Sequence, residues 1–157
     1  LVPDPAKALR AFLRVLKPKG KASVTVPGAP EKTPFMSIPM KAIAKHVPGF
    51  KPPPPGAPGF FAIPSLDMLR ELFLKAGFSN FTGQVIESGQ VVQVDSAEEY
   101  WQMITEIAGV LALVFTKLPE EKKQAIKNEV IVTLKNMFPS GPVQLGGEAI
   151  LGTGTKL

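Results

Sequence analysis

Residues 4–26 of this 157-residue chain read DPAKALRAFLRVLKPKGKASVTV, and this stretch decides the fold class. Asp4 followed by Pro5 is typical of a helix start, because aspartate caps free N–H groups and proline fits the first turn. Apolar side chains then recur at helical spacing until a proline-glycine turn. Lys21–Val26 alternates apolar and polar residues, as a strand with one buried face does. The stretch predicts a helix over Pro5–Leu16 and then a strand, which is one unit of an α/β fold.

Patterns further along the chain predict more helices and strands of the same fold. Serine caps precede two apolar helical runs, and glycine and proline bound the others. The expected elements are a helix over Leu66–Ala76 that ends at Gly77, a strand over Phe81–Val94 interrupted at Glu87–Gln90, a helix from the Ser96 cap to Leu118, a helix from Glu120 to the residue before Pro139, and a strand over Val143–Thr153.

The segment from Pro27 to Pro64 has a different composition from the rest of the chain. It holds eleven of the 17 prolines, which exclude most regular structure, although apolar spacing predicts a short helix from Met36 to Val47. A segment of this length with little regular structure is uncommon unless it is a lid, a binding loop or a linker. Its four phenylalanines argue against a solvated linker, so we expect a lid or insertion.

Composition excludes several classes of site. The chain has no cysteine and a single histidine, His46, so we expect no disulfide, no thiol nucleophile and no metal centre. The longest apolar run, Ile107–Phe115, is far shorter than the ~20 residues that span a membrane, and no signal peptide is evident. We therefore expect a cytoplasmic protein without a membrane partner. Because that run is apolar on every face, we expect a helix buried all round or covered by a partner, with Gly109 allowing close packing.

The formal net charge of +5 invites the hypothesis of a nucleic-acid partner, but its distribution disfavours one. Residues 1–21 hold six basic side chains and one acidic one, so the whole excess lies in this segment. Four of the basic residues form a helical stripe that could bind phosphate, although a solvated helix face explains it more simply. Exposed aromatic platforms for bases are not evident, so we expect no nucleic-acid partner.

Several motifs in order resemble class I S-adenosylmethionine-dependent methyltransferases, in particular the members similar to ubiquinone and menaquinone biosynthesis enzymes. Residues 4–20 resemble the fourth helix and following turn of that family, with Ala11 where glutamate is usual and Lys19 where glycine is usual. The strand that follows, the helix ending in Ala-Gly-Phe at 76–78 and two closing strands keep the family's order. Residues 95–101 are similar to the start of a helical insertion.

The resemblance implies the C-terminal half of a Rossmann-like methyltransferase fold, with a mixed sheet whose last strand is antiparallel. We expect one domain, incomplete at its N-terminus. Its expected parts are a core helix and strand at 1–26, a proline-rich lid at 27–64, a core helix and strand at 65–94, a helical insertion at 95–138 and a C-terminal strand at 139–157.

The same resemblance implies that the cofactor-binding elements are absent. In the family, a glycine-rich turn after the first strand and an acidic residue after the second hold S-adenosylmethionine, and both would precede Leu1. The only G-x-G here is Gly152-Thr153-Gly154, near the C-terminus with no helix after it. We therefore expect this chain alone to bind no cofactor and to be inactive, whereas the parent enzyme methylates a small-molecule substrate.

Two sets of residues are candidates for chemistry or binding. His46 could act as a general base, since its usual pKa suits neutral pH, but no carboxylate to orient it is evident and a histidine at a helix end is usually solvated. Five aromatic residues could line an apolar substrate pocket or equally pack in the core. These residues are Phe35, Phe60, Phe61, Tyr100 and Trp101.

A second hypothesis makes the chain a non-catalytic fragment that associates with itself. In the implied fold, Lys21–Val26 pairs on one side with the final strand and on the other with a strand outside this chain. An unpaired strand exposes a row of backbone donors and acceptors. We therefore expect a homodimer or larger oligomer.

Overall fold

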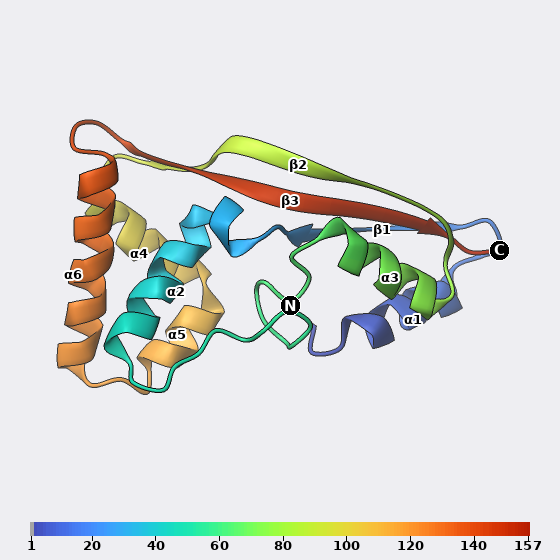
Figure 1. Cartoon of the computed structure of the whole chain (residues 1–157), viewed down its shortest axis with the longest axis horizontal. Coiled ribbons are helices and arrows are strands. Elements are labelled where there is room, and N and C mark those ends of the chain that lie inside the picture. Colours follow the sequence, from blue (N-terminus) through green and yellow to red (C-terminus); the bar gives the residue numbers. More distant parts are fainter. Residues whose placement is uncertain (1) are drawn as a thin grey trace. The chain divides into compact units, whose positions relative to one another are not determined.

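The computed structural model of the chain describes residues 2–157, and the side chains at positions 110 and 113 lie outside the description. The protein combines helices with a three-stranded antiparallel sheet, so the predicted α/β class is confirmed (Figure 1). The strands are β1 (Lys21–Pro27), β2 (Ser79–Val94) and β3 (Val143–Thr155). The helices are α1 (Pro5–Val15), the short 3-10 helix η1 (Pro30–Lys32), α2 (Pro34–His46), α3 (Leu66–Ala76), α4 (Ala97–Ile107), α5 (Gly109–Phe115) and α6 (Glu120–Met137).

Internal contacts divide the chain into two compact units where the sequence predicts one domain. Unit 1 contains the described residues up to Thr33 together with Pro53–Ser88 and Gly147–Leu157. Unit 2 contains Pro34–Pro52 and Gly89–Gly146. The proline-rich segment is thus shared, because Pro34–Pro52, which includes α2, belongs to unit 2, while the rest of the segment belongs to unit 1.

Helix α1 begins as predicted. The Asp4 carboxylate accepts the backbone N–H of Lys7 at 2.8 Å, and Pro5 fills the first turn. After the helix, Lys19 adopts a left-handed backbone with φ of 65°, and its N–H donates to the carbonyl of Lys156 at 2.8 Å. This conformation favours glycine, which is the residue that the resemblance expects at this position.

Helix α3 also has the predicted caps. The Ser65 hydroxyl accepts the N–H of Met68 at 3.3 Å at the start of the helix. At its end Gly77 has φ of 99°, and the N–H of Phe78 donates to the carbonyl of Phe73 at 3.1 Å. The left-handed glycine and this bond satisfy carbonyls that the last turn would leave unpaired.

The strand order is β1-β3-β2, so the last strand of the chain lies between the other two. Val24 of β1 faces Gly152 of β3 in an antiparallel register, which confirms the predicted pairing of the first strand with the last. Both neighbours of β3 therefore run in the same direction. The described sheet has no parallel pair, so it differs from the predicted mixed sheet. Strand β2 is also continuous from Ser79 to Val94, which corrects the interruption predicted at 87–90; β2 is hydrogen-bonded to β3, and a neighbouring strand favours extended backbone.

The core of unit 1 forms where α3 packs closely against β3. Phe73 is fully buried, and its ring lies 5.1 Å from that of Phe78 and 5.3 Å from that of Phe81, centroid to centroid. A Cβ at Gly154 would lie 2.6 Å from Phe73 Cδ1, and one at Gly152 would lie 2.7 Å from Leu69 Cδ2. The G-x-G motif therefore makes room for the side chains of α3.

The core of unit 2 lies among its helices, with α6 packed against both α2 and α4. Tyr100 is buried there, its hydroxyl donates to the carbonyl of Phe35, and burial raises the pKa of the phenol. The single helix predicted from Ser96 to Leu118 is instead two helices, because the backbone turns away from helical geometry at Ala108.

Two alternatives were predicted for the apolar run from Ile107 to Phe115. Burial on every face is wrong, because Ile107 is 64% exposed. Cover by a partner stays a prediction. A Cβ at Gly109 would have no neighbour within 4 Å, so this glycine does not serve close packing. The side chains of Val110 and Leu113 lie outside the described part of the chain. Across residues 2–157, no helix is both long and apolar enough to cross a membrane.

Candidate functional site

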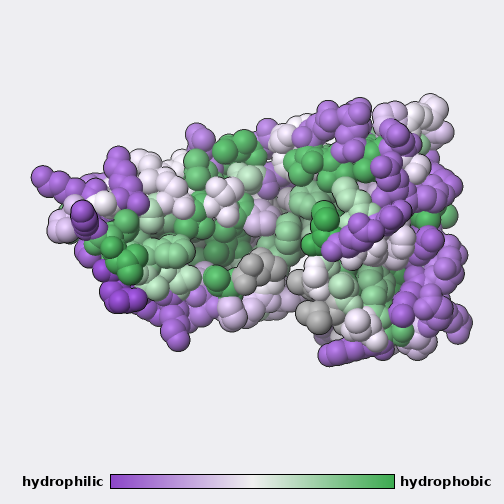
Figure 2. All heavy atoms as spheres, turned by 180° about the vertical axis from the view of Figure 1, so that it is seen from behind, coloured by the Kyte–Doolittle hydropathy of each residue, from purple (hydrophilic) through white to green (hydrophobic). Residues whose placement is uncertain are grey.

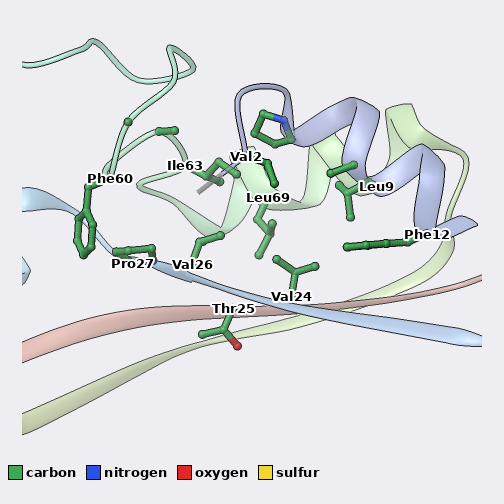
Figure 3. Close-up of a pocket in the computed structure, with 14 residues that line it drawn as sticks. Val2, Leu9, Phe12, Val24, Thr25, Val26, Pro27, Phe60, Ile63 and Leu69 are labelled. Atoms are coloured by element: carbon green, nitrogen blue, oxygen red, sulfur yellow. The ribbon is translucent and has the colours of Figure 1, made fainter. Parts of the chain in front are cut away.

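An apolar pocket of about 290 Å³ lies in unit 1 between α1, β1 and the loop at 59–63 (Figure 3). Val24 and Val26 of β1 point into it, and Thr25 between them points the opposite way. The remaining wall comes from Leu9 and Phe12 of α1, Leu69 of α3, and Phe60. Because Thr25 is the only polar residue among those that line the pocket, its inner surface consists of apolar side chains.

The local sequence explains why these side chains converge. The alternation in β1 places its valines on the face that α1 covers, while Ser23 and Thr25 face the other side. On α1, Leu9 is buried in the core, and Phe12, three residues later, lies at the rim of the pocket and is 46% exposed. Figure 2 shows hydrophobic atoms gathered in a band over the unit that contains α1 and α3, with hydrophilic atoms around the band.

A second hollow of about 430 Å³ shares Pro5, Ala62 and Ile63 with the first. Its wall is more polar, since Asp4, Glu71 and Lys75 contribute to it. Glu71 and Lys75 form an ion pair at 3.0 Å between neighbouring turns of α3, on the surface. Exposed ion pairs of this kind contribute little to stability. Because ligand pockets are lined mostly by apolar side chains, the first pocket is the better candidate for binding.

The structure places the five aromatic candidates in different environments. Phe60 lines the apolar pocket, and Phe61 packs edge-on against it with ring centroids 4.9 Å apart. The other three belong to unit 2, where Tyr100 is in the core and the ring of Trp101 lies 5.3 Å from that of Phe115. One of the five thus lines the pocket.

The sequence did not identify the other walls of this pocket. Val24 and Val26 lie on the apolar face of the predicted strand, and Leu9 and Phe12 belong to the apolar pattern of the predicted helix. Both patterns are typical of core residues. Such a pattern shows which face a side chain occupies, but not whether a neighbour covers it. The incomplete coverage of these side chains is a tertiary property.

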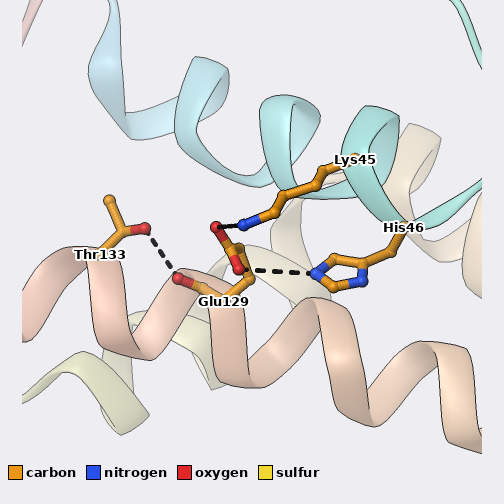
Figure 4. Close-up of polar contacts among 4 residues, drawn as sticks. All are labelled: Lys45, His46, Glu129 and Thr133. Carbon is orange, nitrogen blue, oxygen red and sulfur yellow. Dashed lines mark hydrogen bonds and ion pairs between the residues drawn. The ribbon is translucent and has the colours of Figure 1, made fainter.

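His46 lies in a surface cluster of unit 2 with Lys45 and Glu129 (Figure 4). The Glu129 carboxylate accepts from Lys45 Nζ at 2.7 Å and lies 3.6 Å from His46 Nε2. The sequence showed no carboxylate near His46, because Glu129 comes from the distant helix α6. His46 lines neither of the two pockets described above, and its contact with Glu129 joins α2 to α6.

The Glu129 cluster predicts a pH dependence of stability. The hydrogen bond from Lys45 holds the pKa of the Glu129 carboxyl below its usual value, although burial opposes this, and His46 lowers it further. A carboxyl with a lowered folded pKa stabilises the fold above its unfolded pKa, and this stabilisation is lost as pH falls through the folded value. We expect Glu129→Gln to lower the stability of unit 2 at pH 7 and to have a smaller effect at pH 3.

Urea unfolding followed by Trp101 fluorescence measures this difference, since Trp101 lies in the same unit. Glu121→Gln is the control for the loss of one negative charge from the same helix, because Glu121 forms no ion pair within residues 2–157. Glu121 lies in the first turn of α6, so its own loss reports the interaction with the helix dipole alone. If Glu129→Gln lowers the free energy of unfolding by the same amount at pH 3 as at pH 7, the ion pair is not the source of the loss.

The described residues contain no cluster of three or more histidine, aspartate or glutamate side chains able to hold a metal ion. No family model matches this chain, and no curated protein matches it.

Proposed function

We propose that the chain is the C-terminal part of an S-adenosylmethionine-dependent methyltransferase that acts on a small-molecule acceptor. The observation that carries this proposal is the position of β3 between β1 and β2, because the resemblance of residues 4–26 expects the first strand here to pair with the last one. The order of caps and strands along the chain supports the same assignment.

In this proposal, the apolar pocket beside β1 binds the small molecule that accepts the methyl group. Methyl transfer from a sulfonium depends mainly on in-line positioning in a site that excludes water, so an apolar cavity without an obligatory catalytic side chain suits it. Phe60, from the proline-rich segment, lies at the pocket wall where a lid residue would contact an acceptor.

The residues present do not fit the cofactor itself. In the only G-x-G, Leu69 and Phe73 of α3 occupy the space beside the two glycines, so a ligand cannot approach the backbone there. In this proposal the chain therefore contributes substrate-side elements, and the cofactor-binding elements lie outside it.

Two titrations test the proposal. Calorimetry with S-adenosylmethionine should show no binding to the 157-residue chain, whereas the neutral fluorescent probe N-phenyl-1-naphthylamine should bind. Phe60→Ala should weaken probe binding about tenfold, since an aromatic contact of roughly 1.4 kcal/mol is lost. Leu74→Ala is the control, because Leu74 is an exposed hydrophobic residue of the same unit that lines neither pocket.

A low micromolar dissociation constant for S-adenosylmethionine, about −8 kcal/mol, would place a cofactor site within this chain and overturn the division proposed here. Probe binding that is insensitive to Phe60→Ala would remove the pocket as the acceptor site.

A specific observation also favours the second function, that of a self-associating module. Strand β1 is at the end of the sheet, and within residues 2–157 no strand pairs with its outer edge. Such an edge is a template for another chain.

A further inference from the structure

The outer edge of β1 has a regular set of backbone groups available for pairing. Gly28 N–H donates to the Glu148 carbonyl at 2.7 Å and Lys156 N–H donates to the Gly20 carbonyl at 2.8 Å, so the even-numbered residues of this stretch bond to β3. By the alternation of an antiparallel ladder, the backbone groups of the odd-numbered residues point away from β3. These residues are Lys21, Ser23, Thr25 and Pro27.

This edge is complementary to itself about Val24, the centre of the seven-residue strand. If two copies pair antiparallel with full overlap, Ser23 of each faces Thr25 of the other and exchanges both backbone hydrogen bonds. Pro27, which has no N–H to donate, then falls opposite Lys21 at the end of the ladder, where its missing donor costs least. The inward side chains of the two strands also match, with Val24 next to its own copy.

Helix α1 has an uncovered apolar side that such pairing would cover. Ala8, Phe12 and Val15 lie along one side of the helix at spacings of four and three residues, and Phe12 and Val15 are 46% and 68% exposed. Phe12 and Ala8 line the pocket beside β1, so this side of the helix faces that strand. In a two-fold pair both α1 helices cover the same face of the joined sheet, and their apolar sides face each other.

The charges favour the antiparallel arrangement. The basic stripe of α1 lies on a different side of the helix from Phe12 and Val15, so it does not enter the contact. Antiparallel pairing keeps the Lys21 residues of the two copies at opposite ends of the ladder. Parallel pairing would instead place Lys21 next to its own copy.

We infer that the chain forms a two-fold dimer through antiparallel β1–β1 pairing centred on Val24, sealed by the apolar sides of the two α1 helices. This inference rests on the second function proposed above and names its interface.

Sedimentation equilibrium of the full chain tests the interface. The wild type is expected to be a dimer, and Thr25→Pro should weaken it at least 100-fold, because proline removes an outward N–H without touching the bonds between β1 and β3. Thr25→Val keeps that N–H and should remain a dimer. Circular dichroism checks that both variants are folded.

Disulfide formation tests the register, since the chain has no cysteine of its own. A mixture of Ser23→Cys and Thr25→Cys chains should form a mixed disulfide under mild oxidation, because paired Cα atoms lie about 5.5 Å apart. Either variant alone should cross-link poorly, since identical positions are then about 8 Å apart, beyond the reach of a disulfide.

The outcomes test the β1–β1 interface separately from self-association itself. A wild-type monomer overturns both. A dimer that Thr25→Pro leaves intact supports self-association and overturns this interface. Efficient cross-linking of Ser23→Cys with itself overturns the register, because it places residue 23 opposite its own copy.

Discussion

Phe73→Ala is expected to destabilise unit 1 by about 4 kcal/mol, which is close to the whole stability of a small domain. The side chain is fully buried at the contact of α3 with β3, and its ring packs against Phe78 and Phe81. Truncation removes apolar burial and leaves a cavity beside Gly154, which has no side chain to fill it. Equilibrium urea unfolding followed by far-UV circular dichroism measures the loss.

Leu74→Ala is the matched control for this prediction. Leu74 is the next residue of the same helix and is 47% exposed, so its truncation should cost less than about 1 kcal/mol. Trp101 fluorescence, recorded in parallel, reports on unit 2. Equal losses for the two variants would mean that Phe73 is not part of a close-packed core.

Gly154→Val is expected to destabilise the same unit by about 3 kcal/mol through overpacking. The first carbon of any side chain at this position would lie 2.6 Å from Phe73 Cδ1 and 2.8 Å from Phe78 Cβ. These contacts involve rings that are held in the core, so neither can move aside without disturbing its own neighbours.

The same substitution at Gly89 is the control. Gly89 is also a strand glycine, but no atom lies within 4 Å of its Cβ position, so valine should cost less than about 0.5 kcal/mol there. Thermal unfolding by circular dichroism compares the two. If Gly154→Val is as stable as the wild type, α3 does not pack on β3 as closely as described. The G-x-G motif would then be open to a ligand.

The sequence predictions were correct where an element depends on neighbouring residues, and they were wrong where it depends on residues far away in the sequence. The caps at Asp4, Ser65 and Gly77 were predicted correctly, because each depends on residues within one turn. The break at Ala108 and the continuity of β2 through Gly89 were missed. A strand continues through a glycine when its neighbour supplies the ladder, and β3 comes more than fifty residues later in the chain.

The candidate site shows the same division. The sequence shows no acidic residue close enough to His46 to orient its ring. The apolar faces of α1 and β1 have the pattern of residues buried in a core. Packing of α6 on α2 brings Glu129 to the histidine, and the pocket forms where α1, α3 and the loop at 59–63 meet over β1.

Local sequence patterns are enough to predict the α/β class, the ends of α1 and α3, and the alternation that places Val24 and Val26 on one face of β1. These features follow from local periodicity and from side chains that bond to their own backbone neighbours. Three features became visible only in the folded chain. Gly152 and Gly154 make room for α3, Glu129 contacts Lys45 and His46, and no strand within residues 2–157 pairs with the outer edge of β1. Each of these depends on distant segments meeting, and periodicity shows which face is apolar without showing what covers it.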